Sequence, residues 1–548
     1  MTRSGSMTVA AGIALSRVAG LVRESLVRGR LGLGGAGDSF TNALRIPNLL
    51  QNLLGEGVLS ASFIPVYSAM VDEDERAAAR LANTMFAFLL AVVTPVVLLG
   101  VVAAGPLTRL VAPGLDDARH ELTTDLVQIM TPGVGVLVLS AWSLGVLNSH
   151  RSFFVPYAAP VIWNLTQIVV VLAAGTGVLA EDLAATVAWA VTGGAVLQLL
   201  VQVPALRRVN GHLGRGGVAF AAAPFRDVLG RLGPVILGRG SAQISAFIDI
   251  FFASLLATGA IAAIGIAQVL YLLPISLFAM SVAAAELPEM SRLSGDARRL
   301  GERLELALET VTFWMAFTTV AYVLAGRDVV GAIFSLVPGS LLDDDAQLLV
   351  AIVLAVYALG LPAIGGSRVM QNTFYALGDT QTPARVAVTR YIVSALVAVF
   401  FMFQGDQLFV YDGTVTGLDR LLAPLEPLAA EIRADDSRPL RLGAAGLAVG
   451  ATFGAWTEAL LLRMYLRAML RKDRISGEQW RRLVLPTLVA ALMMLLLLPI
   501  ARGLHDVVAA LLLLVPAGSA YVALAARQRI RVARRLLRRG SAPSIDTN

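Results

Sequence analysis

Residues 81–108 read LANTMFAFLLAVVTPVVLLGVVAAGPLT, a stretch without a single charged side chain. A helix needs about 20 mainly apolar residues to cross the hydrocarbon core of a bilayer, so this stretch is long enough to span a membrane. Working outward from it, the chain contains further uncharged apolar runs at 126–149, 152–180, 183–206, 346–367, 483–501 and 507–526. The sequence therefore predicts an all-α polytopic membrane protein.

The composition of the whole chain supports the same fold class and argues against catalysis. Of its 548 residues, 57% are hydrophobic and 15% are charged, whereas soluble domains carry roughly 25% charged residues. The absence of cysteine excludes disulfides and thiolate metal sites. The four scattered histidines form no H-E-x-x-H motif, and the chain has no Walker A loop. We therefore expect a transporter rather than an enzyme, with no bound cofactor.

Seven further spans complete the predicted set. The uncharged run 250–285 is too long for one span, and residues 257–260 (ATGA) are predicted to form a tight turn within it. The remaining spans are expected at 306–326, 386–404 and 444–462 and, despite several charges, at 7–28 and 38–70. The predicted total is fourteen transmembrane helices.

The distribution of arginine predicts the topology of these spans. Arginines cluster in every second link, whereas the links between them hold more acids, including Asp343, Asp344 and Asp345. Positively charged loops stay in the cytoplasm, so both termini are predicted to be cytoplasmic. The longest polar loop, 404–441, is then extracytoplasmic. The basic tail 528–548 is predicted to be cytoplasmic and to lie on anionic lipid.

Two similar hairpins suggest an internal repeat. Residues 147–156 read LNSHRSFFVP and residues 374–383 read FYALGDTQTP, at an offset of 227 residues. Two six-helix halves with pseudo-twofold symmetry would explain this offset, and transporters built from such repeats bind substrate between them. A chance similarity of two hairpins is the alternative. The predicted domains are an N-terminal lobe at 1–206, a C-terminal lobe at 207–470, and two further helices at 471–527.

Several charges fall inside the predicted spans, although a charge at the centre of a membrane helix costs roughly 2.5–3.5 kcal/mol. The first span carries Arg17, Arg23 and Glu24. At 3.6 residues per turn, Arg17 and Glu24 share a face of the helix while Arg23 points elsewhere. The second span adds Asp38 and Glu56 as cavity or structural acids.

These charges have two interpretations. Arginines around a water-filled cavity would bind a phosphate or diphosphate, because guanidinium groups match phosphate geometry. Alternatively, they form structural ion pairs such as Arg17–Glu24, or reach to the membrane surface from helix ends. Arg390 and Glu458, in the spans at 386–404 and 444–462, could simply pair with each other.

The first span also carries a family resemblance. Residues 16–24, SRVAGLVRE, resemble the first-helix signature of the MurJ/MviN family of lipid II flippases. The similarity extends over almost the whole chain and includes residues 38–40 (DSF), 46–48 (IPN), 55–57 (GEG), 60–66 (SASFIPV), 145–148 (GVLN), 374–383 and 443–448 (GAAGLA), with Pro160, Asn164, Pro234, Gln243, Asp249 and Pro288. Together these motifs are specific, although each alone would be weak.

The resemblance implies a fold and an activity. Family members have two six-helix lobes around a cationic cavity and two C-terminal helices that form a groove for a lipid tail. The implied cargo is lipid II, which is undecaprenyl-diphosphate carrying the peptidoglycan disaccharide-pentapeptide. Transport would use alternating access in the bacterial cytoplasmic (inner) membrane and serve cell wall biogenesis. Coupling to Na⁺, H⁺ or the membrane potential and contacts with cell-wall synthesis enzymes are further expectations, and no nucleic acid is expected as a partner.

The chain departs from the family pattern at two places. An arginine pair usually follows the Pro-Asn of the second helix, but here these positions hold Gln51 and Asn52. The family's eighth helix carries charges where residues 268–272 (QVLYL) have none. The predicted head-group and diphosphate site consists of Arg17, Arg23, Arg239, Asn48 and Gln51, in which Arg239 replaces a missing charge. By family analogy, Asp249 is a candidate cation or proton site.

Three other functions remain open on the sequence alone. A paralogue that moves another polyprenyl-diphosphate-linked oligosaccharide would fit the missing arginines. A cation-coupled drug exporter would need acids in the cavity rather than arginines. A non-transporting scaffold for cell-wall enzymes is disfavoured by the lack of a soluble domain.

Overall fold

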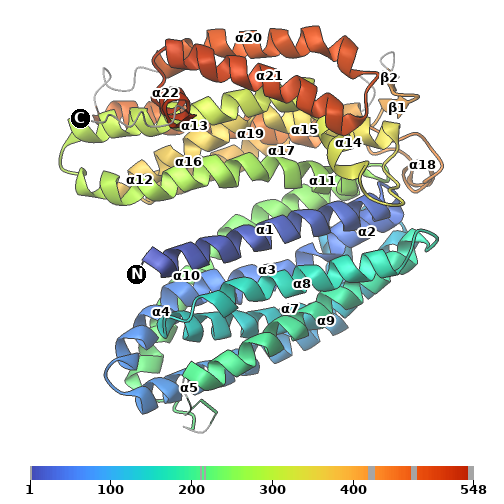
Figure 1. Cartoon of the computed structure of the whole chain (residues 1–548). Helices are drawn as coiled ribbons and strands as arrows, with labels where there is room; N and C mark the ends of the chain where they lie inside the picture. Colours follow the sequence, from blue (N-terminus) through green and yellow to red (C-terminus); the bar gives the residue numbers. More distant parts are fainter. Residues whose placement is uncertain are drawn as a thin grey trace. The chain divides into compact units, whose positions relative to one another are not determined.

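The computed structural model describes residues 3–209, 211, 213–214, 217–417, 426–470 and 478–540, and within these ranges it describes only the backbone of 3–11, 13, 237–246, 478–479 and 538–540. The chain divides into two compact units (Figure 1). The first contains Met1–Ala262, Val337–Leu341 and Ala430–Asp436, and the second contains the remaining residues. Both consist almost entirely of α-helices, as the sequence predicts.

Ten helices of different lengths make up most of the first unit. They are α1 (Arg3–Leu31), α2 (Gly35–Ala43), α3 (Arg45–Leu54), α4 (Glu56–Val71), α5 (Glu75–Val102), α6 (Ala104–Val111), α7 (Asp117–Ser149), α8 (Phe154–Ala173), α9 (Ala180–Val209) and α10 (Ala223–Ser254). Helix α7 packs against α5 and α9, and α8 packs against α1 and α9. The short helix α18 (Ala430–Arg433) also belongs to this unit. Helix α10 falls in the predicted C-terminal lobe at 207–470 but groups with the first unit.

The second unit contains the remaining helices and a small hairpin. They are α11 (Ala260–Pro274), a π-helical turn (Ile275–Ala279), α12 (Met280–Arg292), α13 (Ala297–Leu324), α14 (Gly326–Phe334), α15 (Asp344–Ala358), α16 (Leu361–Ala376), α17 (Gln381–Gly405), β1 (Phe409–Tyr411), β2 (Thr414–Thr416), α19 (Gly443–Leu470), α20 (Glu478–Ala501), α21 (Asp506–Arg527) and α22 (Arg531–Gly540). Helices α20 and α21, which were predicted to form a lipid-tail groove, pack against each other and against α13. The groove itself stays a prediction.

A glycine stripe explains the tight packing of α17 on α19. Gly446, Gly450 and Gly454 are spaced four residues apart on α19. A Cβ at Gly446 would collide with the backbone of Phe401, and one at Gly450 would lie 2.5 Å from the carbonyl oxygen of Ser394. Such small-residue stripes let membrane helices approach closely and gain van der Waals contact.

The described helices account for a multi-pass membrane protein. Eleven helical segments are long and apolar enough to cross a membrane, with Gly35–Val71 and Ala260–Arg292 each counted whole. A twelfth span is formed if α15 and α16, bent by 42°, count as one. Helices α1 and α10 are not among these candidates, so the predicted count of fourteen is not confirmed. Large apolar side chains are exposed along α5, α8, α9, α20 and α21, as expected where lipid rather than water is the solvent.

Two local predictions can be checked directly. The turn expected at 257–260 separates α10 from α11, and Gly259 has a φ of 91°, which favours glycine. The span predicted at 38–70 is found as the candidate span Gly35–Val71, but it is divided into α2, α3 and α4 rather than forming one straight helix. The break between α3 and α4 falls at Gly55, where the backbone is extended.

The two similar hairpins end their helices in the same way. The N–H of Ser152 bonds the carbonyl of Leu147 at 2.9 Å, and the N–H of Asp379 bonds that of Phe374 at 2.9 Å. In each case the preceding residue has a positive φ, 59° at Arg151 and 78° at Gly378. This six-to-one bond after a left-handed residue is the Schellman cap. The 227-residue offset therefore relates structurally equivalent turns, one in each unit.

Candidate substrate-binding site

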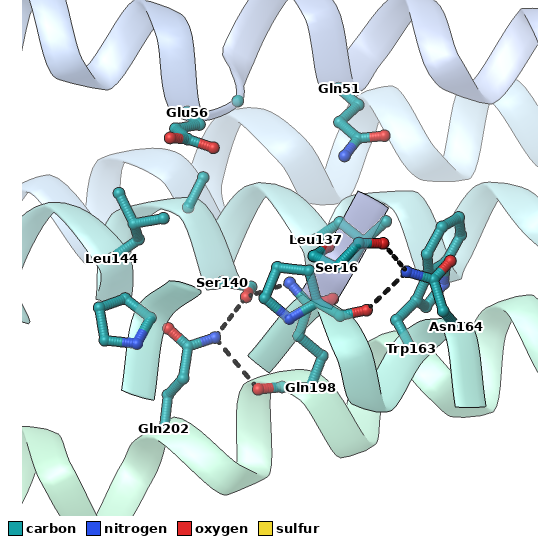
Figure 2. A pocket seen from close by; sticks show the side chains of 14 residues that line it. Ser16, Gln51, Glu56, Leu137, Ser140, Leu144, Trp163, Asn164, Gln198 and Gln202 are labelled. Carbon is teal, nitrogen blue, oxygen red and sulfur yellow. Dashed lines mark hydrogen bonds between the residues drawn. The ribbon is translucent and has the colours of Figure 1, made fainter. Parts of the chain in front are cut away.

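A cavity of about 340 Å³ lies within the first unit (Figure 2). Six helices provide its polar wall. The polar lining residues are Ser16 on α1, Gln51 on α3, Glu56 on α4, Ser140 on α7, Asn164 on α8, and Gln198 and Gln202 on α9. The rest of the wall is apolar and consists of Gly55, Leu137, Ala141, Leu144, Pro156, Pro160 and Trp163. We refer to it below as the first-unit cavity.

The break between α3 and α4 places two side chains on the cavity wall. A Cβ at Gly55 would collide with the carbonyl oxygen of Gln51, so only glycine fits this extended position without distortion. Gln51 lies at the end of α3 and Glu56 begins α4. Figure 2 shows both side chains on the same side of the cavity. The GEG motif at 55–57 therefore helps to shape this site.

The opposite wall is a network of amides around one hydroxyl. The Nε2 groups of Gln198 and Gln202 lie 2.9 Å and 2.6 Å from Ser140 Oγ. Gln202 Nε2 also donates to the carbonyl of Gln198 at 3.1 Å. Asn164 Nδ2 donates to the carbonyl of Pro160 at 3.0 Å. Gln202 Oε1 is buried and has no hydrogen-bond partner among the described residues.

Arg23 lies against an aromatic residue of the cavity. Its guanidinium carbon is 4.6 Å from the ring centroid of Trp163, a cation–π distance. The ring is held in place because Trp163 Nε1 donates to the carbonyl of Val191 at 3.0 Å. Arg23 also forms an ion pair with Glu24, and Arg28 Nε lies 2.6 Å from the same carboxylate. The guanidinium of Arg23 is thus largely buried and already paired with a carboxylate.

The alternative interpretation, in which Arg17 pairs with Glu24, is wrong. Glu24 is bound by Arg23 and Arg28 instead. Arg28 lies one turn away on the same face and Arg23 is the adjacent residue, whereas Arg17 lies two turns, about 10 Å, along the helix. Arg17 is exposed, and the described residues give it no ion-pair partner. Of the two predicted site arginines whose side chains are described, Arg17 is therefore the one without an ion-pair partner among the described residues.

The other predicted site residues are dispersed. Gln51 lines the first-unit cavity, whereas Asn48 is half-buried outside its wall. The side chain of Arg239 lies outside the described residues. Asp249 is half-buried and has an interaction partner. Within the described ranges, no group of three or more histidine or acidic side chains could hold a metal ion, and the cationic diphosphate site stays a prediction.

Asp38 does not line the first-unit cavity but belongs to a buried network of hydrogen bonds and ion pairs. Its carboxylate is 1% exposed and accepts hydrogen bonds from the backbone N–H groups of Gly259 at 2.8 Å and Ala262 at 2.7 Å. Arg119 Nη1 lies 3.2 Å from Asp38 Oδ2, and Arg119 also pairs with Asp116. The network joins the start of α2, the start of α7 and the turn before α11.

Asp116, just before α7 and outside the spans, makes the stability of this network pH-dependent. Burial raises the pKa of its carboxyl, but hydrogen bonds from the backbone N–H and guanidinium of Arg119 outweigh burial and lower it. A carboxylate whose folded pKa is depressed stabilises the protein above its unfolded pKa, and the contribution is lost as the pH falls through the folded pKa. Asp116→Asn should therefore lower the unfolding temperature near neutral pH and have little effect in strong acid. An equal difference at both pH values would contradict this assignment.

The second unit contains the ion pair anticipated between Arg390 and Glu458. Arg390 Nη1 lies 2.7 Å from Glu458 Oε2, and Gln371 Nε2 donates to Glu458 Oε1 at 2.7 Å. Glu458 is 2% exposed. The prediction that these two charges neutralise each other is confirmed, and the pair links α17 to α19.

Sequence reasoning missed Ser140, Gln198 and Gln202. The two glutamines occur four residues apart in the otherwise apolar run at 183–206, so they lie on one face of a helix. Polar side chains that repeat on one face of a membrane helix point to a protein interior or a water-filled cavity. The four-residue spacing of these glutamines could therefore have indicated a polar wall.

Comparisons with known proteins agree with the family resemblance. A family model described as lipid II flippase MurJ matches residues 29–408. A probable lipid II flippase MurJ of Bdellovibrio bacteriovorus is 32% identical over 423 residues, which cover 75% of this chain and 79% of that protein. The lipid II flippase MurJ of Burkholderia cenocepacia is 30% identical over 410 residues, which cover 72% and 77% of the two chains.

Solved structures share the fold. A lipid II flippase MurJ in an inward closed conformation superposes with a TM-score of 0.70 at 19% identity, covering 96% of this chain and all of that one. An inward-facing multidrug transporter of the MATE family gives a TM-score of 0.63 at 16% identity, covering 85% and 99%. At such identities the likeness concerns the fold alone. The family model, however, matches well over half of the sequence, and the chain therefore belongs to the lipid II flippase MurJ family.

Proposed function

We propose that the chain flips lipid II from the cytoplasmic to the outer leaflet of the bacterial cytoplasmic membrane by alternating access. The observation that carries this proposal is the match of the lipid II flippase family model to residues 29–408, supported by relatives that align over about three quarters of the chain. The protein is a transporter rather than an enzyme. The cargo is a lipid-linked glycan, and its head group would supply peptidoglycan synthesis outside the cell.

The described surfaces suit an amphiphilic cargo. A polar head group cannot cross a hydrocarbon layer alone, because each unsatisfied polar group costs several kcal/mol there. The first-unit cavity offers amides and a hydroxyl inside a helical unit whose outer surface is apolar. Arg17, exposed and next to the lining residue Ser16, supplies a cation that a diphosphate would bind.

Topology and energy coupling are part of the same proposal. The arginine-rich links favour cytoplasmic termini. Helix α22 supports this orientation because it is a basic amphipathic helix, suited to an anionic leaflet. Coupling to Na⁺, H⁺ or the membrane potential is proposed by family analogy, with Asp249 as the candidate ion site. Cell-wall synthesis enzymes are proposed as partners that receive the flipped lipid.

Complementation tests the proposed function. The chain is expressed in a bacterium depleted of its own lipid II flippase, and lipid II exposed on the outer leaflet is measured together with growth. We expect growth and exposure to be restored together. If the protein is inserted in the membrane but neither is restored, the proposal is wrong and a different polyprenyl-linked glycan becomes the better cargo.

A further inference from the structure

The described wall of the first-unit cavity suits a neutral ligand better than a diphosphate. Among the described residues that line it there is no arginine or lysine, and its one charged residue, Glu56, has an interaction partner of its own. The amides of Gln51, Asn164 and Gln198 provide both donors and acceptors, whereas an ionised diphosphate can only accept hydrogen bonds. The hydrogen-bonding groups of this wall therefore favour an uncharged ligand with donors of its own over the anionic part of the cargo.

The size of the cavity restricts what can enter. Small-molecule sites commonly measure about 300–1,000 Å³, so a cavity of about 340 Å³ lies at the lower end of this range. This is room for a sugar residue or a few peptide units, but not for a disaccharide carrying five amino acids. Trp163, whose ring carries the Arg23 guanidinium, also lines the cavity.

The side-chain oxygen of Gln202 is a hydrogen-bond acceptor that a ligand could satisfy. Gln202 is 1% exposed and its Nε2 is fixed by Ser140 Oγ and by the carbonyl of Gln198. These bonds determine which way the amide points and leave Oε1 buried without a partner among the described residues. A buried acceptor without a partner is costly, and an N–H or O–H donor from a bound ligand would satisfy it.

We propose that the first-unit cavity is a subsite for the uncharged part of the cargo head group, an N-acetylated sugar, and that it is separate from the site that holds the diphosphate. Gln202 Oε1 accepts a hydrogen bond from an amide N–H or a hydroxyl of the sugar. The proposal rests on the flippase function proposed above and assigns the specificity of transport to neutral side chains on α7, α8 and α9.

Binding of soluble head-group fragments to the purified full-length protein tests the subsite. Four probes are compared by ligand-observed NMR: the disaccharide of N-acetylated amino sugars, the pentapeptide, the two joined, and inorganic diphosphate. Gln202→Met removes the acceptor at similar size. The matched control is Gln167→Met, because Gln167 is equally buried, donates to the carbonyl four residues earlier at 3.2 Å, and does not line the cavity.

We expect Gln202→Met to weaken disaccharide binding by about tenfold, while Gln167→Met and the binding of diphosphate stay unchanged. If the pentapeptide shows the loss and the disaccharide does not, the assignment to a sugar is overturned. If Gln202→Met leaves both fragments unaffected, or weakens diphosphate binding, the proposal is overturned. Gln198→Met provides a second test if Gln202→Met does not fold.

Failure of the proposed subsite can be distinguished from failure of the proposed flippase function. If the unaltered chain complements a flippase-depleted bacterium but the Gln202 and Gln198 variants bind every fragment normally, only the subsite is wrong. If the chain binds the disaccharide through Gln202 but fails to complement, the subsite stands and the cargo is another glycan lipid.

Discussion

Replacing Asp38 with alanine should destabilise the first unit by about 3–5 kcal/mol, because it removes one partner of a buried ion pair. The carboxylate is 1% exposed and accepts from Gly259 N, Ala262 N and Arg119 Nη1. Without it, the N–H groups of Gly259, just before α11, and Ala262, in its first turn, lose their acceptor. Of the ion pairs that Arg119 forms among the described residues, only the one with Asp116 remains. The measurement is the free energy of unfolding in detergent, by denaturant titration.

Glu121→Ala is the matched control for this change. Glu121 lies on α7 two residues after Arg119 but is exposed, and exposed substitutions usually change stability by less than about 0.5 kcal/mol. An Asp38→Ala variant as stable as Glu121→Ala would show that the buried network does not hold these segments together.

Glu458→Ala should destabilise the second unit by a similar amount, about 3–5 kcal/mol, since it strands a partly buried guanidinium. Arg390 is bound by Glu458 at 2.7 Å, and Gln371 would also lose its acceptor. Replacing Arg390 and Glu458 together with leucine should recover most of the loss, because two apolar side chains of suitable size can replace a buried pair at little cost. Unfolding free energies of the single and double variants measure this coupling.

An exposed ion pair of the same unit gives the comparison. Arg298 and Glu302 pair at 3.1 Å, but their side chains are 73% and 63% exposed. Glu302→Ala should therefore cost at most about 0.5 kcal/mol. If Glu458→Ala costs no more than Glu302→Ala, burial does not strengthen the Arg390–Glu458 pair and our account of α17 and α19 is wrong.

Features set by local chemistry were predictable from the sequence. The turn at Gly259 follows from an apolar run too long for one span. The pairing of Arg390 with Glu458 follows from the cost of two opposite charges in membrane helices. The equivalent caps at Arg151 and Gly378 follow from two similar hairpin sequences. Each depends on spacing or on one strong energetic constraint.

Features set by long-range packing were not predictable. Arg119 is 81 residues from Asp38, and no local pattern connects a residue at the start of α7 with one on α2. Glu24 pairs with Arg23 and Arg28 rather than with Arg17, because nearer cations on the same helix compete for one carboxylate. The amide wall at Gln198 and Gln202 depends on Ser140 of another helix, so its geometry emerges only in the folded unit.

The central claim concerns movement of a lipid across a bilayer, and reconstitution tests it most directly. The purified chain is inserted into vesicles that contain lipid II, and the fraction of lipid II that reaches the opposite leaflet is followed over time with a membrane-impermeant reagent. We predict faster movement of lipid II than in protein-free vesicles, with no matching acceleration of a phospholipid. Equal rates with and without correctly inserted protein, at every ion gradient and potential applied, would contradict the account.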